Sequence, residues 1–352
     1  MSTPVKTDRP ITIEEIVDDV RERGDAALVQ WSQRLDQTTA SVPERAVAYG
    51  DIPTGAVLDA AQSVRTWHAA QRPQDITLEV SPGVTLERRW TPLRSVGVYV
   101  PRGLVSSLIM GAVPAQVAGV ERIVVCTPPK GAAAVAAAAA LLGIEEVWAV
   151  GGAQAIAAMA YGTESIARVD KIVGPGGGAV NAAKLLVSRD VAIDLPAGPS
   201  EIVVVADVGF DETIIQQELD AQMEHGPDSR AFVVRVGDDV DEALAQVEAY
   251  AAEHVALLGP RAESLAGRIR NAGAVFVGPY SPVPAGDYAT GGNHVLPTGG
   301  WSRSTGGLGL EAFMKTVTVQ RLSRDGLERL APTIEALAEL EGMNAHKATA
   351  RR

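Results

Sequence analysis

The sequence has a single cysteine, Cys126, so no disulfide bond can form within the chain. Disulfides are common in secreted proteins and rare in the reducing cytoplasm, so this cysteine usage favours a cytoplasmic protein. Residues 1–10 lead into an acidic segment and not an apolar one, so no signal peptide is expected. The alanine-rich run at 132–142 is too short and too weakly apolar to span a bilayer.

Positive charge and aromatic side chains are also scarce. The chain has 31 Lys and Arg against 43 Asp and Glu, and its formal net charge is −12. Nucleic acids and anionic membranes bind basic patches, so neither is an expected partner. Aromatic residues make up only 4% of the chain, which leaves few side chains for stacking on bases. A length of 352 residues suits two domains or one large domain.

The spacing of apolar residues predicts an α/β fold. Apolar residues recur every three or four positions over 13–35 and 55–71, which predicts helices there. Short apolar strands then alternate with helices over 95–194, and a second series of this kind runs over 202–278. Repeated strand–helix–strand units predict mostly parallel sheets covered by helices.

In the last third of the chain, strands and helices are no longer expected to alternate regularly. A helix is expected over 260–273, followed by a long loop rich in Gly, Pro and Ser over 279–310. A loop of that length in a compact protein is usually functional or disordered, and its aromatic and histidine content favours function. From about Arg324 to His346 the pattern predicts an amphipathic helix.

Four of the five histidines lie in short segments rich in acids, amides and glycines. They are His225, His254, His294 and His346, whereas His68 lies on an ordinary amphipathic stretch. Neutral imidazole is a common metal ligand and a common general base near pH 7. This distribution predicts a metal-assisted enzyme.

Gln222 and His225 are three residues apart on a predicted helix and therefore share a face. With Asp287 on the long loop and His346 near the C-terminus, they would supply two imidazoles, a carboxylate and an amide oxygen. That set suits zinc, although an amide is an unusual ligand. The alternative interpretation is that His225 caps the helix and Gln222 is a solvated side chain.

Glu253 and His254 are adjacent, at the end of a predicted helix and before a strand. An acid beside an imidazole can relay protons, with Glu253 acting toward water and His254 toward an alcohol. The alternative is a helix-end histidine cation stabilised by the helix dipole, with a solvated Glu beside it.

Two glycine-rich turns could bind ligands. Residues 174–179, Gly-Pro-Gly-Gly-Gly-Ala, follow a strand and open a helix, as loops that hold pyrophosphate on backbone amides do. The alternative is a tight turn between a strand and a helix. Residues 197–201 are either a turn or a means of presenting the Ser200 hydroxyl beside a strand end.

Longer motifs follow one another in a fixed order: RSVGVYVPRG (94–103), VGGAQAIAAMAYGTES (150–165), DKIVGPG (170–176), DLPAGPSEIVVVAD (194–207), EHGPDS (224–229), AEH (252–254), SPVPAGDYATGGNHVLPTGG (281–300) and EGMNAHK (341–347). In this order the chain resembles the histidinol dehydrogenase family, from about residue 10 to the C-terminus. The resemblance implies oxidation of L-histidinol to L-histidine, the last step of histidine biosynthesis. It implies two NAD⁺-dependent steps and one zinc ion per subunit.

The resemblance also assigns roles to individual residues. The zinc-ligand positions are Gln222, His225, Asp287 and His346, and these also contact substrate. The acid–base pair is Glu253 and His254, and His254 is again a substrate contact. Further substrate contacts are Ser200, His294 and Glu341, and the NAD contacts are Tyr99 and Gln154. The family's tail comes from the neighbouring subunit, so the resemblance implies a homodimer with shared active sites.

The implied fold has two Rossmann-like parallel-sheet domains, arranged as in aldehyde dehydrogenases, and a C-terminal helical tail. The NAD-binding domain is expected at 96–201. It would be inserted in a discontinuous domain, 10–95 with 202–310, that carries the zinc and catalytic residues. The tail is expected at 311–352, and the resemblance implies that it is exchanged between subunits.

The chain departs from the family at several places. Gly177 replaces an Asn that contacts NAD, Ala179 replaces an aromatic residue, and Val283 replaces a Glu beside the substrate. The segment between His225 and Glu253 is shorter by roughly one helix–strand unit. Three other functions therefore stay open: a related NAD-dependent dehydrogenase of another amino- or sulfo-polyol, a zinc hydrolase with a relic nucleotide domain, and a non-catalytic metal-binding or assembly protein.

Overall fold

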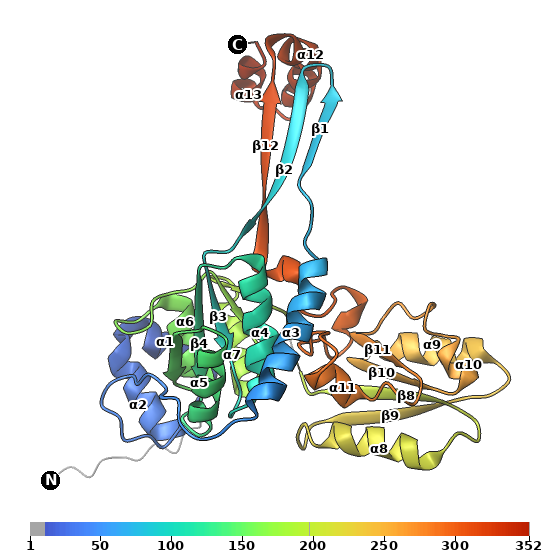
Figure 1. The fold of residues 1–352 in the computed structure, drawn as a ribbon. Helices are drawn as coiled ribbons and strands as arrows, with labels where there is room; N and C mark the ends of the chain where they lie inside the picture. The colour runs from blue at the N-terminus through green and yellow to red at the C-terminus, as the bar shows by residue number, and fades with distance from the viewer. Residues whose placement is uncertain (1–10, 197, 352) are drawn as a thin grey trace. The chain divides into compact units, whose positions relative to one another are not determined.

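The computed structural model describes residues 11–196 and 198–351, which separate into two compact units (Figure 1). Unit 1 contains the described residues up to Gln71 together with Leu93–Phe313. Unit 2 contains Arg72–Pro92 and the described residues from Met314 onward. Within the described ranges, no helix is long and apolar enough to cross a membrane. Residues 1–10, on which the expectation of no signal peptide rests, lie outside the described residues.

A five-stranded sheet forms the first part of unit 1. Its strands are all parallel and follow the order β5-β4-β3-β6-β7. The strands are β3 (Ser95–Tyr99), β4 (Arg122–Thr127), β5 (Glu146–Ala149), β6 (Lys171–Val173) and β7 (Ala192–Ile193). The chain reverses its direction across the sheet between β3 and β6, and ligands of such sheets bind beside the strand ends at this reversal.

Helices cover both faces of the five-stranded sheet. On one face α1 (Ile13–Arg23) and α2 (Asp25–Leu35) contact α6 (Gly152–Tyr161), and α1 also contacts α7 (Gly178–Val187). On the other face α3 (Thr54–Ala70), α4 (Val105–Ala118) and α5 (Ala132–Leu141) contact one another. The expected helix over 13–35 is divided at Gly24, whose φ of 56° ends α1.

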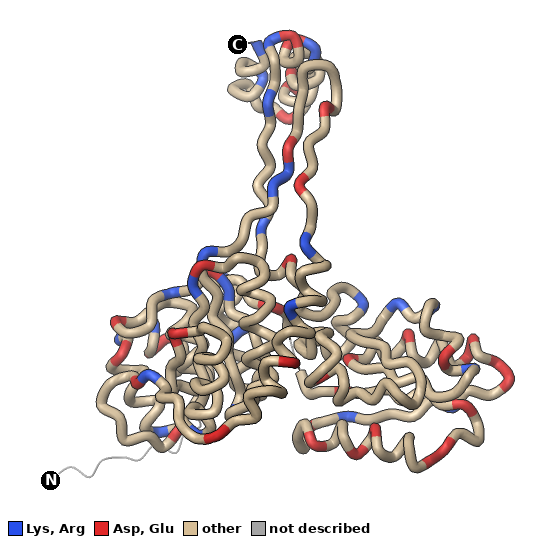
Figure 2. Tube along the Cα trace, in the orientation of Figure 1, with Lys and Arg blue, Asp and Glu red and all other residues tan. Residues whose placement is uncertain are grey.

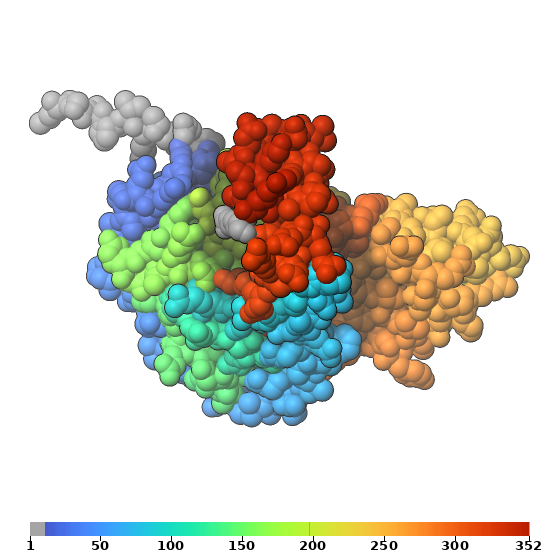
Figure 3. Space-filling model, turned by 90° about the horizontal axis from the view of Figure 1, so that it is seen from above, coloured from blue at the N-terminus to red at the C-terminus, as the bar shows by residue number. Residues whose placement is uncertain are grey.

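A four-stranded parallel sheet, in the order β11-β10-β8-β9, forms the second part of unit 1. Its strands are β8 (Glu201–Asp207), β9 (Arg230–Val236), β10 (His254–Leu258) and β11 (Ala274–Val277). The helix α8 (Glu212–Met223) packs on one face with α11 (Val283–Tyr288), and α9 (Val240–Tyr250) and α10 (Pro260–Glu263) pack on the other. Figure 3 shows this part as a continuous packed body, coloured yellow to orange.

These two sheets confirm the predicted α/β fold with parallel sheets. The expected helix over 260–273 is wrong beyond Glu263, where the chain continues in turns. Gly267 lies in that stretch, and glycine is a poor helix former. The expected loop over 279–310 contains the short helix α11 and the 3₁₀ turn η1 (Trp301–Arg303), and a second such turn, η2 (Leu310–Phe313), follows at its end.

Unit 2 consists of a three-stranded antiparallel sheet and two helices. The sheet has the order β1 (Ile76–Ser81), β2 (Val84–Pro92) and β12 (Met314–Leu322), and none of these strands was predicted. β12 pairs with β2 along its whole length, from Met314 opposite Pro92 to Leu322 opposite Val84. Basic and acidic residues are interspersed along these strands (Figure 2). The expected C-terminal tail therefore begins with a strand before its helices.

The two helices of unit 2 are α12 (Arg324–Leu340) and α13 (Asn344–Thr349). Ser323 caps α12 by accepting a hydrogen bond from the amide of Gly326 at 3.0 Å. The single helix expected up to His346 is broken at Gly342, whose φ of 72° favours glycine.

Candidate active site

The helix α8 places Gln222 and His225 at the edge of the four-stranded sheet. Asp211 caps the helix by accepting a hydrogen bond from the Thr213 amide at 2.9 Å. Gln222 lies in the last turn and is buried, and His225 follows directly after the helix. The Nδ1 atom of His225 lies 3.2 Å from the carbonyl oxygen of Gln222. A carbonyl only accepts hydrogen bonds, so Nδ1 donates this one; in the neutral form of the ring, Nε2 then has a free lone pair.

That lone pair faces a carboxylate. The Nε2 atom of His225 lies 3.9 Å from Oδ2 of Asp287, which is on α11, and α11 packs against α8. Burial raises the pKa of Asp287, and nearby His225 opposes that shift. Gln222 Nε2 donates to the Ser200 hydroxyl at 2.8 Å, whereas Gln222 Oε1 is buried with no hydrogen-bond partner among residues 11–196 and 198–351. A buried carbonyl oxygen without a partner costs free energy, and a cation would remove that cost.

This donor set fits a zinc ion. An imidazole lone pair, a carboxylate and an unpartnered amide oxygen come from His225, Asp287 and Gln222 in unit 1. The fourth expected ligand, His346, is exposed on α13 in unit 2, and the expected substrate contact Glu341 is exposed at the end of α12. Among residues 11–196 and 198–351, no three His, Cys, Asp or Glu side chains are grouped closely enough to hold a metal by themselves.

Glu253 and His254 lie at the beginning of β10, in the interior of the four-stranded sheet. The helix α9 ends at Tyr250, and Ala251 adopts the left-handed conformation with φ of 51° before the strand. Both side chains are buried, at 7% and 2% exposure, so the alternative of a solvated Glu and a helix-end histidine cation is wrong. His254 pairs in β10 with residues of both neighbouring strands.

Burial moves the pKa values of this pair in opposite directions. It raises the pKa of Glu253 to about 8, against hydrogen bonds from the Ser200 hydroxyl at 2.6 Å and the Glu201 amide at 3.0 Å. Burial also lowers the pKa of His254 to about 3, and nearby His225 adds to this shift. His254 Nδ1 lies 3.6 Å from Glu253 Oε2, and neither ring nitrogen of His254 has a hydrogen-bond partner among the described residues. His254 is therefore a neutral ring with unused nitrogens, next to an acid that titrates near neutral pH.

His294 approaches the same region from the long loop. Its Nδ1 lies 3.2 Å from the carbonyl oxygen of Asp287, so Nδ1 carries the proton. Its Nε2 then accepts from the hydroxyl of Ser107 at 3.3 Å. Burial lowers the pKa of His294 to about 4, so the ring is neutral at pH 7. Ser107 lies on α4, and no sequence motif marks its part in the site.

Of these residues, His254, Asp287 and His294 line a cavity of about 190 Å³ beside β10 and β11. Its lining includes His254, Phe276, Asp287, Asn293 and His294. Val283 does not line it: the Val283 side chain is 3% exposed and packs in the apolar cluster between the sheet and α8.

Tyr99 and Gln154, the expected NAD contacts, lie at the carboxyl ends of β3 and β5. The Tyr99 hydroxyl accepts a hydrogen bond from the Gly152 amide at 3.1 Å, and burial raises the pKa of Tyr99 to about 12. Gln154 Nε2 donates to Asp36 at 3.0 Å, whereas Gln154 Oε1 is buried without a partner in the described part of the chain. Asp36 comes from the end of α2 and was not anticipated, because nothing local marks it.

The glycine-rich loop at 174–178 is held at its start by a buried ion pair. Lys184 Nζ lies 2.5 Å from Asp194, donates to the Gly174 carbonyl at 2.9 Å, and is 2% exposed. Asp194 accepts from the Gly174 amide at 2.8 Å, so one ion pair holds both polar groups of that glycine. A side chain at Gly177 would meet no atom within 4 Å, and its φ is −68°. The loop is therefore held at Gly174 and is open at Gly177.

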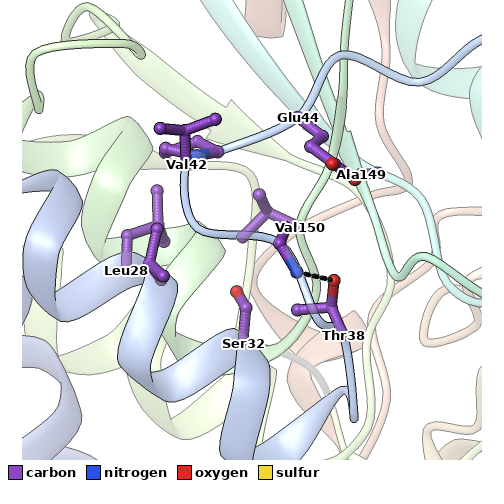
Figure 4. Close-up of a pocket in the computed structure, with 10 residues that line it drawn as sticks. Leu28, Ser32, Thr38, Val42, Glu44, Ala149 and Val150 are labelled. Carbon is purple, nitrogen blue, oxygen red and sulfur yellow. Dashed lines mark hydrogen bonds between the residues drawn. The ribbon is translucent and has the colours of Figure 1, made fainter.

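A second cavity lies between α2 and the end of β5, around Leu28, Ser32, Thr38 and Val150 (Figure 4). Its volume is about 10 Å³, enough for roughly one water molecule. The Ser32 hydroxyl there is buried without a partner, and one water would satisfy it. This cavity is too small for a substrate.

Comparisons with known proteins agree with these features. The sequence model of the histidinol dehydrogenase family matches residues 4–237 and 233–352. The histidinol dehydrogenase of Haloarcula marismortui is 43% identical over 394 residues, which cover 97% of this chain and 92% of that protein. The crystal structure of histidinol dehydrogenase from Elizabethkingia anophelis has a TM-score of 0.89 and 32% identity, over 97% of this chain and 93% of that one. Aldehyde dehydrogenase 21 from Physcomitrella patens shares the fold, with a TM-score of 0.51 at 12% identity and coverage of 88% and 85%.

The raised pKa of Glu253 has a consequence for stability. An unfolded Glu titrates near 4.5, so between about pH 4.5 and 8 the folded chain keeps a proton that the unfolded chain loses, and stability falls as pH rises. The lowered pKa values of His254 and His294 change stability only below about pH 6.5, where an unfolded His takes up a proton. They therefore do not affect the comparison between pH 6.5 and 8. Between pH 6.5 and 8, the free energy of unfolding of the metal-free wild type should fall by up to about 2 kcal/mol more than that of Glu253→Gln. Urea unfolding at several pH values measures this, and parallel curves for the two proteins would contradict it.

Proposed function

Because this chain belongs to the histidinol dehydrogenase family, we propose that it oxidises L-histidinol to L-histidine through L-histidinal, with NAD⁺ and one zinc ion per site. This is the last step of histidine biosynthesis. The observation that carries the proposal is the buried Glu253–His254 pair beside a cavity that His254, Asp287 and His294 line, with His225 3.9 Å from Asp287.

The first half-reaction removes a proton and a hydride from the substrate alcohol. A zinc ion held by Gln222, His225, Asp287 and His346 would supply a Lewis acid that orients and polarises the substrate oxygen. NAD⁺ would supply the hydride acceptor. His254 accepts the alcohol proton, because neither of its ring nitrogens has a hydrogen-bond partner among the described residues. Burial lowers its pKa and makes it a weak base, so this transfer depends on the acidity that a bound zinc ion would give the alcohol.

The second half-reaction oxidises the aldehyde. Glu253 would take a proton from a water molecule that adds to the aldehyde carbon. The resulting hydrate would lose a hydroxyl proton and a second hydride to give the acid, and a second NAD⁺ would be the hydride acceptor. A carboxylate whose pKa is raised to about 8 is a stronger base than an exposed one, so this step should quicken as pH rises toward 8. The Ser200 hydroxyl and the Glu201 amide hold the same carboxylate oxygen and fix its direction.

The open alternative of another amino- or sulfo-polyol rested on Val283. Val283 is buried in the apolar cluster between the sheet and α8. A substrate panel separates the two proposals, because a related dehydrogenase would reduce NAD⁺ faster with another polyol than with L-histidinol.

We expect NADH to form from NAD⁺ and L-histidinol, and a chelator to abolish its formation. His225→Asn should lose the metal as well as the activity, because an amide does not replace an imidazole as a zinc ligand. Glu224→Gln alters the exposed neighbour of His225 and is the control, which should retain both. NADH absorbance and elemental analysis are the measurements. Full metal content in His225→Asn would remove His225 from the ligand set.

Gly177→Asn should tighten NAD⁺ binding. The φ of −68° at Gly177 suits any residue, and a side chain there would meet open space. One added neutral hydrogen bond contributes ~0.5–1.5 kcal/mol, or roughly two- to tenfold in affinity. Gly178→Asn adds the same amide one residue later, also into open space, and serves as the control. Calorimetry that finds equal affinities for Gly177→Asn and wild type would mean that the cofactor takes another path.

Unit 2 supports the proposal of a homodimer with shared sites. Large apolar side chains are exposed along β1, at Ile76, Leu78 and Val80, and on the helices, at Leu337 and Leu340. The first three alternate along the strand and so share one face of the sheet. Apolar surface of this kind is typical of an interface, and a second copy of the chain would cover it.

Subunit mixing tests the shared site. Inactive His346→Asn and inactive His225→Asn proteins are combined and allowed to exchange subunits. If each site takes His225 from one chain and His346 from the other, a mixed dimer contains one intact site and activity returns. Mixed dimers that are confirmed by mass and remain inactive would show that each chain completes its own site.

A further inference from the structure

The helix α4 contains a proline in its interior, Pro114. Proline has no backbone N–H, so the carbonyl four residues earlier, that of Met110, cannot receive its usual helical hydrogen bond. Met110 is 1% exposed, and α4 packs in the interior of unit 1. A buried carbonyl left without a donor is costly, so this position requires a donor from elsewhere in the fold.

Asn293 supplies that donor from the long loop. Its Nδ2 donates to the Met110 carbonyl at 2.8 Å and lies 3.5 Å from Nε2 of the buried His68. Its Oδ1 accepts from the Val295 amide at 3.0 Å. The two ends of one side-chain amide therefore hold the loop in shape and attach it to α4.

The next residue, His294, also attaches the loop to α4. His294 Nε2 accepts from Ser107, which is three residues before Met110 and so on the same face of α4. His294 Nδ1 donates to the carbonyl of Asp287 on α11. Consecutive loop residues thus join the helix that covers the five-stranded sheet to the acid expected to bind the metal.

We propose that Asn293 is a positioning residue: it docks the loop on the Met110 carbonyl that Pro114 leaves free, and so sets where His294 and Asp287 stand. The substrate role of these two residues rests on the proposed function, but the docking itself does not. Asn293 needs no contact with substrate or cofactor for this role.

A stability cycle tests the docking without any substrate. The substitution Pro114→Ala restores a backbone N–H at that position, which can donate to the Met110 carbonyl within the helix. Asn293→Ala should then lower the urea unfolding midpoint by a shift at least about twice as large in the wild-type background as in Pro114→Ala. Equal shifts in the two backgrounds would overturn the proposal. Asn271→Ala, whose described hydrogen bond uses only the backbone amide, is the control for losing an amide side chain.

Asn293→Asp tests the donor end of the Asn293 amide separately from its acceptor end. It keeps an acceptor for the Val295 amide but removes the donor to Met110. It should therefore behave like Asn293→Ala, and a variant that behaved like wild type would overturn the proposal. In ¹⁵N-histidine-labelled protein, the Nδ1–H tautomer of His294 should be a fixed signal in wild type and Asn271→Ala, and should be averaged in Asn293→Asp.

Kinetics distinguish positioning from general stability. At a temperature where all variants are folded, Asn293→Asp should raise the KM for L-histidinol about tenfold or more, because the groups that contact the substrate are displaced. The KM for NAD⁺ should change less than about twofold, because the 174–178 loop is held by Lys184 and Asp194 and not by Asn293. Equal changes in both KM values would indicate a structural role only. If wild type does not oxidise L-histidinol, the proposed function fails, while the unfolding and NMR measurements still decide the docking.

Discussion

The burial of two ionisable side chains at the beginning of β10 is the constraint on which the site depends. His254 is the first residue of β10, a central strand with β8 and β11 on either side, and Glu253 directly precedes it. A charged group in such a place is destabilising, so the acid keeps its proton to higher pH and the imidazole stays neutral. The Ser200 hydroxyl and the Glu201 amide offset part of the cost at Glu253. The protonation states of Glu253 and His254 therefore follow from their burial at the start of β10.

The first sheet contributes residues at the carboxyl ends of its strands to the proposed reaction, and the second contributes residues at the amino ends of its strands. Tyr99 ends β3 and Gly174 follows β6, at the carboxyl ends where the cofactor of such a sheet is expected. Ser200 and Glu253 instead precede β8 and β10, at the amino end of the second sheet. The Ser107–His294 and Asn293–Met110 bonds join these two ends. The long loop is thus the element that links the cofactor side of unit 1 to the substrate side.

Both parallel sheets could be predicted from the sequence, because their strands are buried apolar runs that alternate with helices. β1, β2 and β12 could not: most of their residues are exposed, and β12 pairs with a strand more than 200 residues away. The residues of the site were predicted mainly through motifs. Asp36 and Ser107 were missed, because each acts through a partner more than 100 residues away that no local pattern reveals. The Lys184–Asp194 pair was also missed, although its members are only ten residues apart, because no motif marks it.

A smaller chain can keep this site if the residues that it lacks lie beside an edge strand. The two stretches that match the family overlap at residues 233–237, within and just after β9. The alignment of 394 residues with the Haloarcula protein exceeds this chain's 352, so that protein carries residues that this chain lacks. β9 is the edge strand of its sheet, and it pairs only with β8 among the described strands. A loss beside an edge strand leaves β8 and β10 paired and the ends of α8 and α9 in place. His225 and Glu253 lie on either side of the junction, so both can keep their positions although the chain between them is short.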